Sequence, residues 1–122
     1  MTEANSLSRR LTLTAAGLIG AAGIISAAAA SHAGESRNLS AIALICLAHG
    51  PALLALGVSS LRGRAWSLAA ALLAVGTLIF AGDLGLREWQ GQGAFPGAAP
   101  LGGAGMIGGW IIVVVAAWIH SR

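Results

Sequence analysis

Residues 101–119 of the chain read LGGAGMIGGWIIVVVAAWI, a run of 19 residues without a charged side chain. A bilayer core about 30 Å thick is crossed by about 20 predominantly apolar residues in a helix. No water inside lipid satisfies the backbone N–H and C=O groups, so a single segment that crosses it has to be an α-helix. The stretch therefore predicts a transmembrane helix, with Pro100 at its start.

Three further apolar segments precede this one, separated from each other by charged residues. They are residues 11–30, 39–61 and 65–86. The links at 31–38 and 62–64 are short, which makes consecutive helices antiparallel, and the longer link at 87–100 is rich in glycine and proline. We therefore predict an all-α fold, a single integral-membrane four-helix bundle over residues 1–122 with up-down-up-down topology.

The composition agrees with a protein that lies in lipid. Of the 122 residues, 57% are hydrophobic and 9% are charged, against roughly 25% charged in an ordinary soluble domain. Four crossings use most of the chain and leave no length for a separate soluble domain. The chain has no lysine, which excludes a P-loop and a Schiff-base lysine, and its single cysteine, Cys46, can form neither an intrachain disulfide nor a cysteine-based zinc site.

The seven arginines lie at the ends of the apolar segments, a pattern of membrane topology rather than of nucleic-acid binding. On alternate sides of the predicted bundle they divide five to two: Arg9, Arg10, Arg62, Arg64 and Arg122 against Arg37 and Arg87. Because cytoplasmic loops retain positive charge, both termini are predicted to be cytoplasmic. The expected location is the bacterial cytoplasmic (inner) membrane, as a multi-pass protein.

The first segment admits a second interpretation. Ser8-Arg9-Arg10-Leu11 resembles a twin-arginine signal, with a cleavage site at Ser31-His32-Ala33. The apolar region of a signal usually has about 7 to 15 residues, whereas residues 11–30 form a full crossing. We therefore favour the transmembrane interpretation.

Small residues mark the helix faces that are expected to pack. Lipid tails are as apolar as leucine, so transmembrane helices associate through close backbone packing and a few polar contacts. The candidate packing positions are Gly17, Gly20, Gly23, Gly50, Gly57, Gly105 and Gly109, the last two in GxxxG spacing. The pattern fits packing within one chain and packing against another subunit.

His49 is an ionisable residue at the middle of a predicted span, beside Gly50 and Pro51. A polar group at this depth is costly and is therefore a functional candidate. In one interpretation it handles protons or contacts a ligand. In the other, which we favour, it is structural and donates a hydrogen bond to a carbonyl, to Thr77 or to Trp110.

No cofactor and no metal site are predicted. A haem held by two histidines needs both at one depth, on different helices. The topology puts His32 at the outer end of the first helix, His49 at mid-membrane and His120 at the inner end, so no two share a level.

Asp83 lies about one turn inside the outer end of the third helix and four residues before Arg87, a spacing that places both on one helical face. An interfacial ion pair between them is one prediction. The alternative is a contact between Asp83 and His32, which the topology puts at the same outer level. The remaining charges at this end are expected to be solvated: Glu35, Arg37 and Glu88.

Short motifs spread over nearly the whole chain carry a family resemblance. Ser31-His32-Ala33 is similar to an Ala-His-Ala element, and His49-Gly50-Pro51-Ala52 to a mid-helix His-Ala-Leu-Ala. Phe80-Ala81-Gly82-Asp83-Leu84-Gly85 resembles Phe-Ser-Gly-Ser-Leu-Tyr, Ala99-Pro100-Leu101-Gly102-Gly103 resembles Thr-Pro-Ile-Gly-Gly, and Gly109-Trp110 fits the fourth helix. These elements resemble the YgdD-like family of small four-helix membrane proteins (domain of unknown function 423), whose eukaryotic relatives are called transmembrane protein 256.

The chain departs from that family pattern at three places. Ile45-Cys46 stands where the family has Tyr-Gln, Asp83 replaces a serine and Ala99 replaces a threonine. The shared residues are mainly glycine, proline and histidine, which favours preserved packing over preserved chemistry. The resemblance implies a four-helix membrane fold and, because the family is uncharacterised, no particular activity.

The predicted topology gathers an outer-rim motif at one end of the bundle: His32, Gly82, Asp83, Pro100, Gly102 and Gly103. A proline in the first turn leaves backbone N–H groups free at the positive end of the helix dipole, facing Asp83. Our hypothesis is that the outer-rim motif is a polar docking surface for a partner subunit or a lipid head group.

The leading functional prediction is a non-enzymatic structural or accessory subunit of a larger membrane protein complex. Its partners would be the lipid bilayer and other membrane subunits or further copies of itself, without nucleic acid or a soluble small-molecule substrate. No nucleophile–base pair or metal cluster is evident in the sequence. The alternative is an oligomeric channel or transporter that uses His49, because four short helices cannot enclose a pathway alone. A membrane enzyme or cofactor binder would depend on His49, His32 and Asp83 alone.

Overall fold

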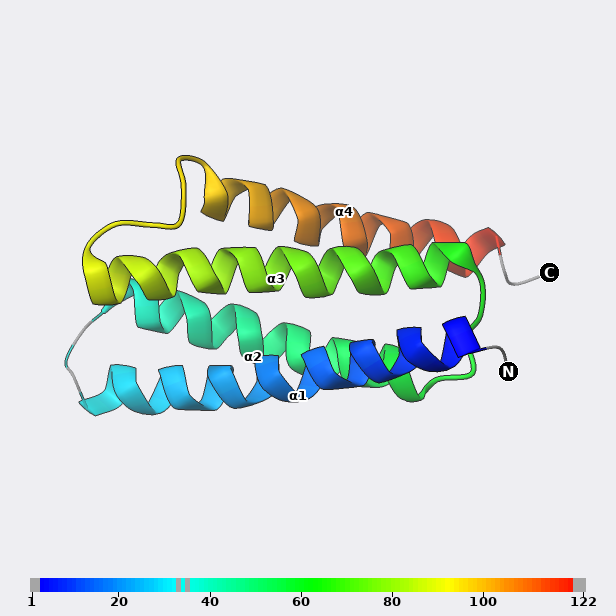
Figure 1. The fold of residues 1–122 in the computed structure, drawn as a ribbon, viewed down its shortest axis with the longest axis horizontal. Coiled ribbons are helices and arrows are strands. Elements are labelled where there is room, and N and C mark those ends of the chain that lie inside the picture. Colours follow the sequence, from blue (N-terminus) through cyan, green and yellow to red (C-terminus); the bar gives the residue numbers. More distant parts are fainter. Residues whose placement is uncertain (1–2, 33, 35, 120–122) are drawn as a thin grey trace.

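The computed structural model describes residues 3–32, 34 and 36–119 of the chain. Predictions on four residues lie outside this part: Ala33, Glu35, His120 and Arg122. Four α-helices make up most of the described part, which contains no strand (Figure 1). They are α1 (Glu3–His32), α2 (Arg37–Val58), α3 (Arg64–Gln90) and α4 (Ala98–Ile119).

All four helices are long and apolar enough to cross a membrane. The two shortest have 22 residues, which at about 1.5 Å per residue gives about 33 Å, comparable with a hydrocarbon core of about 30 Å. Each helix turns large apolar side chains outward, and one example from each is more than half exposed: Ile25, Leu44, Val75 and Ile107. Such a surface suits lipid rather than water. The prediction of an all-α fold with four helices is confirmed, and the length and apolarity of these helices fit a multi-pass membrane protein.

All four helices extend beyond the apolar segments that predicted them, α2 by beginning at Arg37 rather than at residue 39. α1 begins at Glu3 rather than at residue 11, α3 continues to Gln90, and α4 begins at Ala98. The link predicted over 87–100 therefore contracts to residues 91–97. Apolarity marks the part of a helix that lies in lipid, and polar residues continue the same helix beyond it.

Local hydrogen bonds explain where two helices end. Gly91 adopts a left-handed backbone conformation (φ 79°), and its N–H donates to the carbonyl of Arg87, which ends α3. α2 ends at Val58, three residues earlier than predicted. The N–H of Ser59 there donates to the carbonyl of Ala55, after which the chain turns into the link at 59–63.

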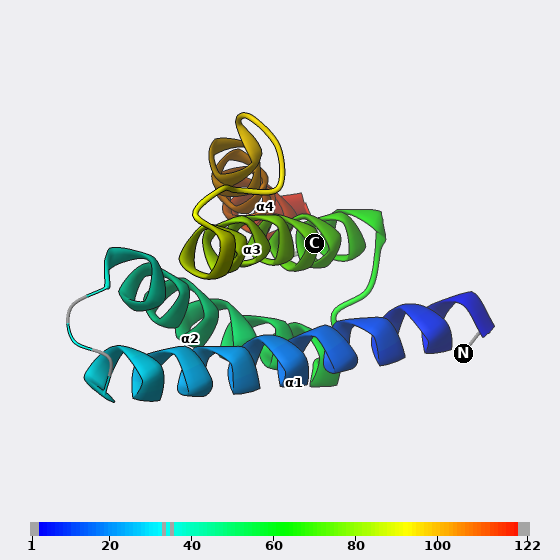
Figure 2. The same ribbon diagram turned by 60° about the vertical axis from the view of Figure 1, so that its left-hand side comes forward.

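The helices lie side by side in chain order (Figures 1 and 2). Packing is most extensive within the α1–α2 pair and the α3–α4 pair, and contacts between α2 and α3 join the two pairs. In the described part of the chain, α4 approaches the backbone of α3 and of no other helix. The start of α1 and the end of α4 lie at the same end of the molecule as the α2–α3 link. The four helices therefore form an open row in which α1 and α4 do not meet.

Glycines bring α1 and α2 together. A Cβ on Gly50 would lie 3.0 Å from the Cα of Gly20 and 3.3 Å from the carbonyl oxygen of Ala16, so this face of α2 rests on the backbone of α1. Gly23 and Gly57 lie in the same interface, each facing a leucine of the partner helix. A larger residue at these positions would push the two helices apart.

The α3–α4 interface is also a contact between backbones. A Cβ on Gly76 would lie 2.7 Å from the carbonyl oxygen of Gly102 and 2.8 Å from the nitrogen of Met106. Gly105 faces Gly76, and Gly109 faces a leucine of α3. Gly76 was not among the packing positions predicted from the sequence, although it lies directly against the backbone of α4.

Candidate functional site

His49 is buried near the middle of α2, and both of its ring nitrogens are hydrogen-bonded. Nδ1 lies 2.9 Å from the carbonyl oxygen of Ile45, one turn earlier, and Nε2 lies 3.1 Å from the indole Nε1 of Trp110 on α4. The two rings meet edge to face, with centroids 5.8 Å apart and an interplanar angle of 68°.

Trp110 assigns the tautomer of His49. An indole N–H can only donate, so Nε2 of His49 is the acceptor, and the single proton of the neutral ring lies on Nδ1 and is donated to Ile45. Two of the three partners predicted for His49 are found, a carbonyl and Trp110. The prediction had His49 donating to Trp110, whereas Trp110 donates to His49. The third, Thr77, instead donates to the carbonyl of Leu73 on its own helix at 2.6 Å.

The hydrogen bond from Trp110 joins two helices that are not direct neighbours among the described residues. α4 packs against α3, and its backbone has no close contact with α2 in the described part of the chain. The indole therefore reaches past α3 to the histidine. With both nitrogens occupied, the ring of His49 has no free position for a metal or for the relay of a proton.

A double-mutant cycle is expected to reveal this bond. Trp110→Phe keeps an aromatic ring and removes the donor, and His49→Leu removes the acceptor. Each single substitution is expected to lower the free energy of unfolding in mixed micelles by about 1 to 2 kcal/mol, because one buried partner is left unpaired. The double variant is expected to lose about 1 kcal/mol less than the sum of the two. Strictly additive losses would contradict the bond.

Asp83 is buried near the end of α3, at 1% exposure, and its carboxylate has several donors around it. Oδ2 accepts from Nε of Arg87 at 2.9 Å, and Oδ1 accepts from the backbone N–H of Ala94 at 2.7 Å. The backbone N–H of Ala99, in the first turn of α4, also interacts with this carboxylate. One side chain thus fastens α3 to the link at 91–97 and to the start of α4.

The ion pair between Asp83 and Arg87, predicted from their spacing, is present. The alternative contact with His32 is not found: the hydrogen bonds of Asp83 in the described residues go to Arg87 of α3 and to the link, while His32 is exposed at the end of α1. The reason is the open row of helices, because α1 touches α3 over a small area and does not reach α4.

The other members of the outer-rim motif lie in different surroundings. Gly102 is inside the α3–α4 interface. Gly82 and Gly103 face open space, with no atom within 4 Å of a Cβ built on either, and Pro100 is exposed in the first turn of α4. Of the residues in this motif, Asp83 takes part in a polar cluster. Its hydrogen bonds go to Arg87 and to the backbone N–H of Ala94, both in the chain itself.

Gly93 is a site residue that the sequence analysis missed. A Cβ on Gly93 would overlap the carboxylate of Asp83 and would lie 2.9 Å from Nε of Arg87. Glycine at this position therefore allows the carboxylate to reach the N–H of Ala94. In the sequence Gly93 is one of several glycines in a link, and no local pattern distinguishes it.

Glu88 is exposed, as expected of a solvated charge, but it lies within α3 rather than in a loop and is held by hydrogen bonds. Both of its carboxylate oxygens accept from the hydroxyl of Ser36 at 2.9 Å, and one accepts from Nδ2 of Asn38 at 3.3 Å. The Ser36 hydroxyl also accepts from the N–H of Leu39 and so caps the start of α2. Glu88 therefore ties the end of α3 to the start of α2 while remaining exposed.

The side chains that could bind a metal ion, His, Cys, Asp and Glu, are few in residues 3–32, 34 and 36–119 of the chain. In that part of the chain no group of three or more His, Cys, Asp or Glu side chains could hold a metal ion. Cys46 is a buried free thiol in the α1–α2 interface, beside Gly23. It packs there as a small apolar side chain.

Comparison with known proteins identifies a family for the chain. A family model described as "Protein of unknown function (DUF423)" matches residues 19–103, a range that begins within α1 and ends within α4. No curated protein and no solved structure matches the chain. The matched range includes His49, Gly76, Asp83 and Gly93, and it ends before Trp110.

Proposed function

The chain belongs to the DUF423 family of proteins of unknown function, and from this premise we propose that it is a non-enzymatic structural or accessory subunit of a larger membrane protein complex. The observation that carries the proposal is how the buried polar side chains are used. His49, Thr77 and Asp83 all bond to atoms of the chain itself. Side chains committed to hydrogen bonds within the chain are not available as nucleophiles, bases or ligands for a reaction.

An open surface supports the second half of the proposal, a partner within the membrane. Gly17 and Gly20 on α1 have no atom within 4 Å of a Cβ built on either. With Pro51 and Leu54 of α2 they line an apolar groove on the outside of the α1–α2 pair. Small residues that face lipid let another transmembrane helix approach closely.

The proposed orientation has four helices in up-down-up-down topology, with both termini in the cytoplasm of a bacterium and the protein in its inner membrane. The five-to-two division of the arginines supports it, since the side richer in arginine is retained in the cytoplasm. That division assigns the end of the molecule with the start of α1 and the α2–α3 link to the cytoplasmic side (Figure 1).

The test is to fill the groove. Gly17→Leu and Gly20→Leu are expected to leave the fold of the chain intact, because both Cβ positions are open, and to release partner subunits or further copies. The readout is the native mass of complexes purified from the cell's own membranes in mild detergent. Gly85→Leu on α3 is the matched control, since a Cβ there also meets no atom within 4 Å.

Two results would go against the proposal. A wild-type chain that purifies alone, or groove variants that keep the wild-type mass, would remove the support for a membrane partner. Ion or solute flux through liposomes that is lost in His49→Ala would favour an oligomeric channel or transporter instead.

A further inference from the structure

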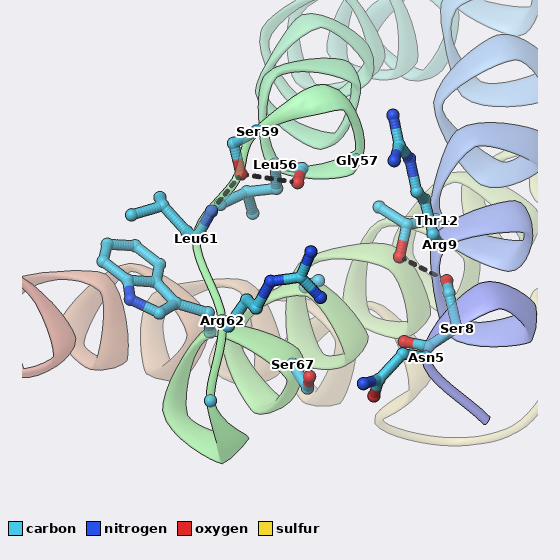
Figure 3. Close-up of a pocket in the computed structure, with 13 residues that line it drawn as sticks. Asn5, Ser8, Arg9, Thr12, Leu56, Gly57, Ser59, Leu61, Arg62 and Ser67 are labelled. Carbon is cyan, nitrogen blue, oxygen red and sulfur yellow. Dashed lines mark hydrogen bonds between the residues drawn. The ribbon is translucent and has the colours of Figure 1, made fainter. Parts of the chain in front are cut away.

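A polar pocket of about 130 Å³ lies at the end of the molecule that carries the start of α1 (Figure 3). Its walls come from α1, the end of α2, the link at 59–63 and the first turns of α3. Neither His49 nor Asp83 lines it. The pocket is therefore separate from the polar contacts that hold the helices together.

Two arginines enter this pocket from different walls. Figure 3 shows the side chains of Arg9, from α1, and Arg62, from the link, directed into the space between those two segments. No lining residue is acidic, and among the described residues the ion pair of the chain is the one between Arg87 and Asp83, on other segments. Two positive charges thus face one cavity without an internal counter-charge, which attracts an anion.

Further hydrogen-bond donors surround the arginines. Ser8 and Ser67 line the pocket, and within the described part of the chain their hydroxyls are not used by other side chains or by the backbone. Gly63, at the start of α3, also lines it, and no side chain caps the free N–H groups of that helix. The indole Nε1 of Trp66, another lining residue, is buried without an acceptor among the described residues.

The arrangement of donors indicates the class of anion. Guanidinium groups from two walls, with further hydroxyls in the lining, match a phosphate, which presents oxygens in several directions, better than a planar carboxylate with two oxygens. The link at 59–63 joins two membrane-spanning helices, so the pocket lies at the level of lipid head groups. Leu56 and Leu61 add an apolar side to its wall, suited to a lipid chain.

We propose that this pocket binds a phosphate group, carried by an anionic phospholipid of the adjoining leaflet or present as soluble phosphate. Arg9 and Arg62 hold the phosphate oxygens from two sides, and the hydroxyls of Ser8 and Ser67 donate to the oxygens that remain. The assignment does not depend on the proposed role as a subunit, because it concerns the chain alone.

The experiment measures binding to the full chain in a neutral detergent by native mass spectrometry. The probes are phosphatidylglycerol, a diacylglycerol with the same acyl chains and no phosphate, and inorganic phosphate as a competitor. Wild type is expected to retain one phosphatidylglycerol in preference to diacylglycerol. Arg9→Gln and Arg62→Gln are expected to weaken this binding roughly tenfold each, as for the loss of a charged hydrogen bond.

The chain supplies matched controls in the neighbouring arginines. Arg10→Gln and Arg64→Gln remove the same charge at the same end of the molecule, but neither residue lines the pocket. They are expected to bind phosphatidylglycerol as wild type does. An equal loss in all four variants would mean unspecific attraction to the basic end of the bundle and would overturn the proposal.

The remaining outcomes separate the two sources of phosphate. Retention of phosphatidylglycerol supports a lipid phosphate. Stabilisation by inorganic phosphate without retention of the lipid, lost in Arg9→Gln and Arg62→Gln, supports soluble phosphate. Binding of diacylglycerol as strong as that of phosphatidylglycerol, or no effect of either phosphate probe, overturns the site. Should a glutamine variant fail to keep wild-type helicity, Arg9→Lys and Arg62→Lys retain the charge and are expected to bind more weakly than wild type because they lose the bidentate contact.

Discussion

Gly76→Val is expected to separate α3 from α4 and to lower the free energy of unfolding by about 3 kcal/mol or more. The first carbon of the new side chain would meet the carbonyl oxygen of Gly102 at 2.7 Å and the nitrogen of Met106 at 2.8 Å. Both are backbone atoms of a helix and cannot turn aside as the end of a flexible side chain can. Since α3 is the helix on which α4 packs, the loss of this interface releases α4.

The measurement is denaturant unfolding in mixed micelles, with tryptophan fluorescence as the signal. Gly85→Val on the same helix is the matched control, because its Cβ position is open, and a change within about 0.5 kcal/mol is expected there. Gly76→Ala is expected to show part of the effect, since its Cβ meets the same two atoms. Equal stability of the Gly76 and Gly85 variants would show that the two backbones can move apart without cost.

Asp83→Ala is expected to free the link at 91–97 and the first turn of α4 from the end of α3. The N–H of Ala94 loses its acceptor, and Arg87 loses its ion pair, when the carboxylate is removed. Hydrogen exchange of the Ala94 amide is the direct readout, and it is expected to become at least roughly tenfold faster. Faster cleavage of the link by protease is expected to accompany it.

Two further substitutions distinguish the contact of this carboxylate with Ala94 from its ion pair with Arg87. Asp83→Asn keeps an oxygen that can accept from Ala94, and Arg87→Gln removes the charged partner while leaving Asp83 in place. Both are expected to keep most of the protection of the Ala94 amide. If Arg87→Gln exposed that amide as much as Asp83→Ala does, the ion pair rather than the contact with Ala94 would hold the link.

The membrane crossings were predictable from the sequence, because apolarity over about 20 residues is a strong local signal. The ends of the helices were not, since polar residues at Glu3 and Gln90 extend a helix as readily as apolar ones do. The stop at Val58 depends on a turn at Ser59, which has no distinct pattern within an apolar run. Helix ends are set by capping and solvation, and both lie outside the hydropathy signal.

The contacts of the candidate site were predictable where depth or spacing along one helix defines them. The four-residue spacing of Asp83 and Arg87 and the similar depth of His49 and Trp110 belong to this class. Contacts set by where separate segments meet in space were missed: Gly76 on α4, Gly93 on Asp83, and Ser36 with Glu88. The prediction that Asp83 pairs with His32 failed for the same reason. The topology predicts the depth of each residue along the bundle, but not which helices lie next to each other.

Synthesis proceeds from the N-terminus, and two contacts of α2 depend on residues made much later. Glu88 follows Ser36 by 52 residues, and Trp110 follows His49 by 61. When α2 leaves the ribosome, Nε2 of His49 therefore does not yet have its hydrogen-bond donor, Trp110. In a nascent chain interrupted before α4, that nitrogen is free to accept a hydrogen bond from any donor nearby. The hydrogen bond of His49 with Trp110 can form only after α4 has been synthesised.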